Sequence, residues 1–477
     1  MTETPVVAPG LDDDTQRLVN GLLELLRKKA PRNKVRKARY DAKYQVKMFA
    51  NVLPPAYQQY ALTLGWSARA VDALAARCRL RCFTHADGMD TLENMGGLDL
   101  IADNDLLSET GQAVTSSLIH ATAWVTTVAG EVEDGEPPVL IQYHDALSAT
   151  GEWNARRRRL DAALVVNDRD KRGNPTSLTL HEYGVVTSLR RDGSQWSVVD
   201  RVEHDYGMTA DPMRYRARLG RPFGSSRITR PMMSIQDEAI RDLMRAEGHM
   251  DVYAWPEFWL LGADKSVFGS DDRFQIMLGR IKAIPDDNDA ANPRADVKQF
   301  PSSSPEPHLA HINAMAKLFA REAGMPDSSL AITDTSNPTS AEAYDSSQYE
   351  LIAEAETAMA GWQSDLERAY VRALAMLNRD PRLMKQGSKI HADWRPARFL
   401  SRSAEADAGM KQLAAVPWLA ETEVGLELLG LTPEQIARAT SERRRNSASS
   451  TLERLLSGGA GAPAEDADEV RAYDDAR

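Results

Sequence analysis

Two kinds of hydrophobic spacing alternate along this chain of 477 residues. Helical spacing, with an apolar residue every three or four positions, is found in residues 14–29, 57–80, 226–253, 305–324 and 341–378. Between about 121 and 218 the spacing becomes alternating, and turn sequences such as EDGEPP and RGNP separate the candidate strands. The pattern predicts an α+β fold with an antiparallel, meander-like β region inserted between helical parts. A later strand, KIHADWRP, lacks a local partner and is predicted to pair with that β region.

The last of these helical patterns is unusually long. It runs from Ala341 to about Asn378, on the order of 55 Å of helix, whereas a typical helix has about 10–14 residues. A soluble helix of that length is expected to span the molecule. The residues predicted to pack along its inner stripe include Tyr344, Leu351, Trp362 and Leu366.

A polar segment separates this pattern from the preceding helix. Residues 325–340 are mostly small, contain the acids Asp327 and Asp334, and include no Lys or Arg. Thr339 stands three residues before Glu342, which is the capping-box spacing, so the next helix is predicted to begin there. The segment is either a plain connection between helices or a loop that contacts a partner.

Charge and hydropathy narrow the possible functions. The net charge of −11 argues against a nucleic-acid binder of the usual basic kind, although a local patch can still touch DNA. No apolar run is long enough to span a bilayer, and the first residues lack the order of a signal peptide. The product is therefore expected to stay in the cell that makes it unless it leaves as part of a larger particle.

A basic stretch follows the first helical pattern and admits two interpretations. It is either a phosphate-binding patch or a solvated face that packs near acidic neighbours in an assembly, and the second interpretation is favoured. Its members are Arg27, Lys28, Lys29, Arg32, Lys34, Arg36, Lys37 and Arg39.

The search for catalytic or metal-binding chemistry gives no positive signal. Cys78 and Cys82 lie four apart on a helical pattern without a second ligand pair, and are predicted to be reduced and packed. His308 and His311 share a helix face but lack a third ligand, and DDNDAANPRAD lacks the Gly and Glu of a calcium loop. Acids on the long helix are expected to face solvent or another subunit: Glu342, Asp345, Glu350, Glu354 and Glu356. We therefore predict no enzyme, no metal and no cofactor.

The order of these parts resembles the portal proteins of tailed phages, in particular those of siphophages infecting actinobacteria. The stretches that carry the resemblance are LPPAYQQYALTLGWSARAVDALAARCRLRCF, RITRPMMSIQDEAIRDLMRAEGHMDVYAWPEFWLLG, MAKLFAREAGMPDSSLAI, NPTSAEAYDSSQYELIAEAE and IHADWRPARFLSRSAEADA. None is a catalytic fingerprint, but together they span nearly the whole chain in the family's order.

The resemblance implies an architecture for each segment. It consists of an N-terminal α+β wing (1–225), a first stem helix (226–253), a β-containing clip (254–304), a second stem helix (305–324), a tunnel loop (325–340), a long wing helix (341–380), a wing strand with a helical crown (381–457) and an acidic tail (458–477) that is expected to be disordered.

The resemblance also implies where partners bind. Contact with DNA is expected from the tunnel-loop residues Asp327, Ser328, Ser329, Thr333, Asp334, Thr335, Ser336 and Asn337. Docking of the packaging motor and of the adaptor is expected at the clip residues Trp255, Trp259, Lys265, Arg273 and Arg280.

The expected function is a dodecameric ring at one capsid vertex, made in the host cytoplasm and carried in the virion. Double-stranded DNA would pass through its channel, without sequence recognition, during packaging and ejection. The expected partners are further copies of the chain, the terminase large subunit, a head-completion adaptor, and the major capsid and scaffolding proteins, with no membrane. Two alternatives remain: another head–tail connector or capsid component, or an enzyme whose site uses no recognisable motif.

Overall fold

The computed structural model describes residues 5–46, 62–253, 258–261, 281–284, 296–299, 304–330, 346–398 and 402–457. Contacts divide the chain into two compact units, the first ending at Ala397 and the second beginning at Arg398. The first unit mixes helices and sheets and the second is helical where it is described, so the prediction of a mixed helix and sheet protein is confirmed. Among the described residues, no helix has both the length and the apolar character needed to cross a bilayer.

The first helix extends further than the sequence indicated. Helix α1 spans Asp13–Tyr40. Asp12 is its N-cap, and the Asp12 carboxylate accepts a hydrogen bond of 2.7 Å from the Thr15 amide. The prediction that it ends at Lys29 is wrong, because the helix continues through Pro31. Proline removes one helical hydrogen bond, but the Lys, Arg and Ala residues around it favour helix. All members of the basic stretch therefore lie on this one helix.

The next predicted helix is shorter than expected and is followed by a strand. Helix α2 covers Trp66–Ala75, and strand β1 covers Leu80–His85. Cys78 therefore lies after the helix and Cys82 lies on β1, so the prediction that they share a helix face is wrong. Neither cysteine is in a disulfide and both are buried, and burial raises the pKa of the Cys78 thiol to about 12.

Strand β13, Ile390–Trp394, is the predicted lone strand, but its partner differs from the expected one. It pairs antiparallel with β1, with Phe83 opposite Ala392, rather than with the central β region. The short 3₁₀ segment η5, Pro381–Lys389, leads into it. The sequence missed this pairing because residues 81–85, directly after the predicted helix 57–80, were not recognised as a strand.

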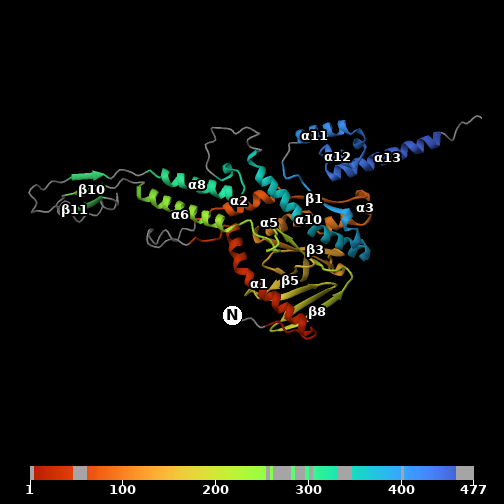
Figure 1. Cartoon of the computed structure of the whole chain (residues 1–477), viewed down its shortest axis with the longest axis horizontal. Helices are drawn as coiled ribbons and strands as arrows, with labels where there is room; N and C mark the ends of the chain where they lie inside the picture. Colours follow the sequence, from red (N-terminus) through yellow and green to blue (C-terminus); the bar gives the residue numbers. More distant parts are fainter. Residues whose placement is uncertain are drawn as a thin grey trace, which may run out of the picture. The chain divides into compact units, whose positions relative to one another are not determined.

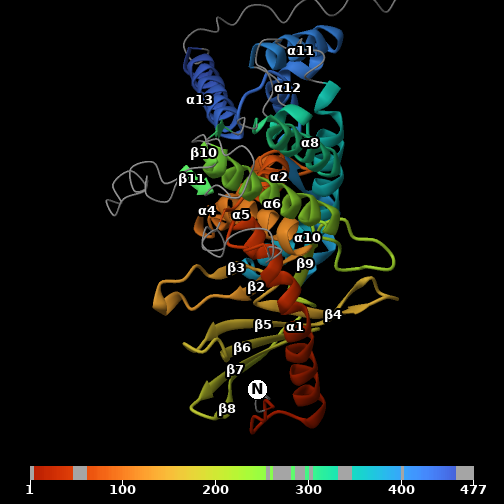
Figure 2. The ribbon, with the colours of Figure 1, turned by 90° about the vertical axis from the view of Figure 1, so that its left-hand side faces the viewer.

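Two antiparallel sheets form the β region. The three-stranded sheet has the order β3-β2-β9 and the five-stranded sheet is the meander β4-β5-β6-β7-β8, so the predicted antiparallel character is confirmed. The bounds are β2 Thr122–Ala129, β3 Val139–His144, β4 Ala149–Asn154, β5 Arg159–Arg169, β6 Pro175–Glu182, β7 Val185–Asp192, β8 Gln195–Glu203 and β9 Ala210–Arg214. Helix α1 lies along the five-stranded sheet (Figure 2), and its leucines pack on Leu164, Leu178 and Trp196.

Helix α10, Tyr349–Leu377, runs through the main core of the first unit. It packs against β2, β3, β9 and β13, against the helices α2 and α4 (Gly97–Asp103), and against the 3₁₀ segment η5. The helices of this region are α3 Met89–Asn94, α4 Gly97–Asp103 and α5 Leu106–His120, with the 3₁₀ turn η2 at Val132–Asp134. Leu351, Trp362 and Leu366, three residues of the predicted stripe, are buried, whereas Tyr344 and the expected cap at Thr339 lie outside the described residues.

The second unit contains α11 Arg402–Ala415, η6 Pro417–Glu421, α12 Glu423–Leu428 and α13 Pro433–Ser457. The sequence places Gln435 three residues after Thr432, a spacing that predicts a capping box at the start of α13. The structure confirms it, because the Gln435 amide donates to Thr432 Oγ1 at 3.3 Å and the Thr432 amide donates to Gln435 Oε1 at 3.0 Å. Residues 458–477, the expected acidic tail, lie outside the described residues.

Three histidines whose pKa is lowered by burial should make the stability of the first unit depend on pH. Burial lowers the pKa of His120 and His144 to about 4 and that of His181 to about 3, from 6.5. Below pH 6.5 the unfolded chain protonates these rings while the folded unit does not, so the free energy of unfolding falls as the pH is lowered toward 4. Asp365 acts in the opposite sense, because burial raises its pKa to about 6, and it offsets one of the three histidines.

We therefore expect the urea midpoint of unfolding to be lower at about pH 5 than at about pH 7. His181→Asn should flatten this dependence because it removes one buried titrating ring. Equal midpoints at the two pH values would contradict the assignment.

Candidate functional site

Two long helices extend from the body of the first unit and lie side by side (Figure 1). They are α6, Arg230–Tyr253, and α8, Glu306–Glu322. Near the body they share an apolar cluster with α2, in which Trp66 packs on Phe319 with ring centroids 5.5 Å apart. Alanines on the facing sides of both helices allow close approach, which fixes the pair to the body at one end.

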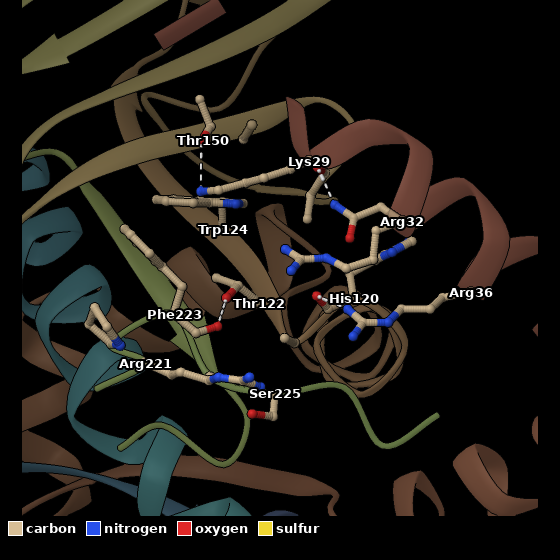
Figure 3. A pocket seen from close by; sticks show the side chains of 16 residues that line it. Lys29, Arg32, Arg36, His120, Thr122, Trp124, Thr150, Arg221, Phe223 and Ser225 are labelled. Atoms are coloured by element: carbon tan, nitrogen blue, oxygen red, sulfur yellow. Dashed lines mark hydrogen bonds between the residues drawn. The ribbon is translucent and has the colours of Figure 1, made fainter. Parts of the chain in front are cut away.

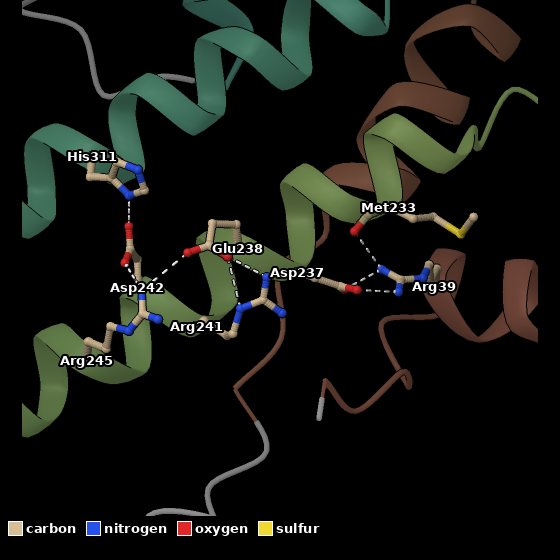
Figure 4. Close-up of polar contacts among 8 residues, drawn as sticks. All are labelled: Arg39, Met233, Asp237, Glu238, Arg241, Asp242, Arg245 and His311. Carbon is tan, nitrogen blue, oxygen red and sulfur yellow. Dashed lines mark hydrogen bonds and ion pairs between the residues drawn. The ribbon is translucent and has the colours of Figure 1, made fainter. Parts of the chain in front are cut away.

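Further along the pair, polar side chains replace the apolar contacts (Figure 4). Arg39, which the sequence placed in a basic stretch, is buried and binds both oxygens of Asp237 on α6 at 2.7 and 2.9 Å. Asp242 is buried on α6 and accepts bonds from Arg245, at 2.9 Å, and from His311 on α8. A bidentate Arg–carboxylate pair sets geometry as well as energy, so these contacts orient α6 against both α1 and α8.

His308 and His311, the histidine pair noted in the sequence, take part in these polar contacts between α6 and α8. His311 binds Asp242, and His308 lies 3.2 Å from His249 between ring nitrogens. The described residues contain no group of three or more side chains placed to hold a metal ion.

The far ends of the two helices carry a small sheet. Its strands are β10 Phe258–Leu261, β11 Ile281–Ile284 and β12 Asp296–Gln299, in the order β11-β10-β12. Strand β10 is parallel to β11 and antiparallel to β12. Trp259 lies on β10, whereas Trp255, Lys265, Arg273 and Arg280 lie outside the described residues, so their role in docking stays a prediction.

At the other end of α8 the chain turns sharply. Gly324 has φ of +60°, its amide donates to Arg321 O at 3.1 Å and the Met325 amide donates to Ala320 O at 2.8 Å, which is the Schellman pattern of a helix C-terminus. Met325 and Pro326 are buried, and the 3₁₀ turn η4, Asp327–Ser329, follows. The exposed part of the predicted loop therefore starts at Asp327 rather than at Met325.

Asp327 and Ser328 are exposed and Ser329 is half-buried. The other residues from which DNA contact was expected lie outside the described residues, namely Thr333, Asp334, Thr335, Ser336 and Asn337.

One buried arginine, Arg227, contacts both the end of α8 and the start of α10, the two helices that flank residues 325–348. Arg227 donates to Ala70 O and to Ala323 O, each at 2.7 Å, and pairs with the carboxylate of Glu354 on α10. Tyr215 donates its hydroxyl to the same carboxylate. The expectation that Glu354 faces solvent or another subunit is wrong, because its side chain is only 12% exposed and is paired inside the unit.

A second arginine holds the start of α10. Arg77 donates to Gln348 Oε1 at 2.6 Å and to Ala397 O at 2.8 Å. A Cβ placed on Gly324 would lie 3.8 Å from Oε2 of both Glu350 and Glu354, so the end of α8 and the first turns of α10 are neighbours. The segment between them therefore leaves and re-enters the body at nearly the same place.

Sequence reasoning missed Arg227 and Arg77. Both act through contacts with residues far away in the chain. Both lie within predicted helical patterns, 57–80 and 226–253, but neither belongs to a motif that would have singled it out. The available signal was weak: Arg227 precedes α6 in a short stretch without a nearby acid, so its charge had to be balanced from elsewhere in the fold.

The comparisons with known proteins agree on one family. The model described as "Phage portal protein, SPP1 Gp6-like" matches residues 27–447. The portal protein of Mycobacterium phage L5 is 25% identical over 394 residues, which cover 78% of this chain and 76% of that protein. The portal protein of Mycobacterium phage D29 is 24% identical over 395 residues, which cover 78% and 77%.

Among solved structures, a chain from the neck of a native GTA particle, computed with C12 symmetry, matches with a TM-score of 0.41 and 14% identity over 76% of this chain and 89% of that chain. Because the family model covers most of its length, this chain belongs to the phage portal protein family of the SPP1 Gp6-like kind, a structural component of the phage virion that takes part in DNA packaging.

Proposed function

We propose that copies of this chain form a closed ring of twelve at one capsid vertex, and that double-stranded DNA passes through the axial channel during packaging and ejection. A ring requires a head-to-tail contact in which each copy offers two different surfaces. Membership of the portal family supports the ring and the channel.

The observation that carries the DNA contact is the anchoring of the segment between α8 and α10. Arg227 and Arg77 hold its two ends on the body, while Asp327 and Ser328 are exposed. Between Met325 and Gln348 the sequence contains no Lys or Arg. We infer that residues 327–337 touch DNA sterically and through hydroxyl and backbone N–H groups, without reading sequence.

The lack of cations suits a conduit. Each phosphate neutralised by Lys or Arg adds affinity through counterion release, and a ring would multiply that affinity by its copies. A polar loop without positive charge can contact moving DNA without binding it tightly.

The end of the α6–α8 pair that carries β10, β11 and β12 is proposed as the docking surface for the terminase large subunit and then for the head-completion adaptor. It is the part of the pair that lies furthest from the shared cluster around Trp66 and Phe319 (Figure 1). The major capsid and scaffolding proteins would contact other surfaces of the ring.

The test is deletion of residues 328–336, bridged by glycine, in a phage that carries the change. Rings should still assemble, because Arg227, Arg77 and the Gly324 turn are untouched, but most of the packaged genome should be lost. The measurement is DNA per particle, beside negative-stain imaging of purified rings.

A Gly/Ser replacement of the same length serves as the control, and it should retain packaging because a contact without sequence recognition needs only a polar loop. A normal genome yield from the deletion would show that the segment is a plain connection. Wild-type protein that never forms rings would show that the proposed assembly is wrong.

A further inference from the structure

Four cations line one cavity of the first unit (Figure 3). Lys29, Arg32 and Arg36 project from α1, and Arg221 comes from the connection between β9 and α6. The cavity has a volume of about 280 Å³, and no carboxylate is found among the described residues that line it. We call it the cationic pocket.

Burial and the charges of neighbouring arginines disfavour the charged forms of Lys29 and Arg36. Burial, followed by the charge of Arg32, lowers the pKa of Lys29 to about 8. Burial, followed by the charges of Arg32 and Arg221, lowers the pKa of Arg36 to about 10. Lys29 Nζ has only weak partners, Thr150 Oγ1 at 3.4 Å and the Phe223 ring with its centroid at 4.7 Å. An anion in the pocket would relieve all of these costs.

The walls of the pocket also hold polar atoms without partners. Within the described part of the chain, His120 Nδ1, Trp124 Nε1 and Asn33 Oδ1 are buried and make no hydrogen bond. Their side chains belong to residues that are at most 6% exposed. The indole N–H is a donor, and a neutral imidazole can carry its proton on either nitrogen, so two of the three suit an oxyanion. Asn33 Oδ1 is an acceptor and would take a water that accompanies it.

An oppositely charged loop lies elsewhere on the same unit. Residues 130–136, the acidic loop, contain Glu131, Glu133, Asp134 and Glu136, all exposed, and no Lys or Arg. Val132, within this loop, is 62% exposed. The Glu131 amide donates to Glu136 Oε2 at 2.9 Å and the Gly135 amide donates to Val132 O at 3.1 Å, so the loop has a defined shape.

Strand β2 sets the separation of the two features. Its first residue, Thr122, lines the cationic pocket and its last, Ala129, leads into the acidic loop. A strand of 8 residues is roughly 26 Å long. The end of β2 and β3 projects from one side of the unit and the connection after β9 from the other (Figure 2). The loop therefore cannot reach the pocket of its own copy.

We infer that the cationic pocket of one copy receives the carboxylates of the acidic loop of the next copy in the ring. This inference rests on the proposed ring, in which each copy must offer two different complementary surfaces. The charges are opposite, and the exposed Val132 matches the aromatic wall formed by Trp124 and Phe223. A phosphate backbone is the less suitable occupant, because four cations in each copy would retain DNA that has to move.

Charge reversal tests the contact. Arg32→Glu in the pocket and Glu133→Lys in the loop, both at exposed positions, should each raise the protein concentration at which half of the chains are in rings by about tenfold or more. The two changes together should return that concentration to within about threefold of the wild type, because they restore one pair of opposite charges. Light scattering after size exclusion and negative-stain imaging measure the rings.

Matched controls and a covalent probe complete the design. Lys34→Glu and Glu24→Lys make the same charge changes at exposed positions of α1 outside the pocket, and should leave assembly unchanged. Chains that carry both Arg32→Cys and Glu133→Cys should form a ladder of cross-linked multimers on oxidation, whereas either single variant should not. The native cysteines are buried and do not compete.

Four results would overturn the inference. Rings that tolerate each reversal, or a double reversal that does not restore assembly, would exclude this contact while leaving the portal function in place. Normal rings of Arg32→Glu with weakened DNA binding would make the pocket a DNA contact instead. Wild-type protein that stays monomeric at every concentration would remove the proposed ring and this contact with it.

Discussion

Replacing Trp362 by alanine is expected to lower the free energy of unfolding of the first unit by about 3–5 kcal/mol. The side chain is 0% exposed, its Nε1 donates to Ser117 Oγ at 3.1 Å, and its ring lies 6.2 Å from that of Tyr215 and 6.3 Å from that of Trp394, between centroids. Truncation removes these contacts and leaves a cavity between α10, α5 and the sheets. Because domains are stable by only about 5–15 kcal/mol, such a loss leaves little folded protein to assemble.

The neighbouring residue gives the control. Gln363 is half-buried and bonds within its own helix to Glu367 Oε1 at 2.9 Å, so Gln363→Ala should change the urea midpoint little. Trp362→Phe, which keeps an aromatic ring but loses the bond to Ser117, should fall between the two. Equal midpoints and equal elution of Trp362→Ala and Gln363→Ala would contradict the role of this side chain in the core.

The second large effect is expected at Arg227. Arg227→Met removes the guanidinium from a site where it is 2% exposed, and leaves the carbonyls of Ala70 and Ala323 without this donor. The Glu354 carboxylate loses its buried cation and keeps the Tyr215 hydroxyl and the partly exposed Arg216. Breaking a buried ion pair from one side costs about 3–5 kcal/mol. The loss should appear in chemical unfolding and as faster amide exchange in the last turn of α8 and the first turns of α10.

Arg216 is a matched control for this substitution because it binds the same carboxylate. It lies 2.6 Å from Glu354 Oε1, but its side chain is 50% exposed, so Arg216→Ala should cost about 0–1 kcal/mol. Replacing Arg227 and Glu354 together by Met should cost less than the sum of the two single changes, since no charge is then left unpaired. Equal effects of Arg227→Met and Arg216→Ala would show that burial does not set the strength of this pair.

Local patterns predicted the elements whose stability is local. The alternating spacing placed the β region between about residues 121 and 218, and strands β2 to β9 lie within that range; the Thr432–Gln435 spacing predicted the start of α13. The pattern failed where distant contacts decide. Strand β4 contains Gly151, where a Cβ would lie 2.9 Å from Ala162 O and 3.0 Å from the Trp124 ring, and so short a segment with a glycine carries little strand signal.

In the candidate site, too, locally encoded features were predicted from the sequence and features that depend on distant contacts were not. The turn at Gly324 was read correctly from the sequence, because a Schellman motif is encoded within a few residues. The contacts of Arg227 and Arg77 and the cationic pocket could not be predicted from the sequence, because each brings together residues that are more than a hundred positions apart. The basic residues themselves were noticed, but their convergence on Arg221 depends on α1 continuing through Pro31.

The adjacent ends of the segment between α8 and α10 limit how far it can extend. About two dozen residues, Met325–Gln348, leave and return to the same place, so only half of this length can point outward. At about 3.3–3.6 Å for each extended residue, the tip can never lie more than roughly 40 Å from the anchor. The segment is therefore a tether whose reach is bounded by its contour length, and its two points of attachment, the end of α8 and the first turns of α10, are neighbours.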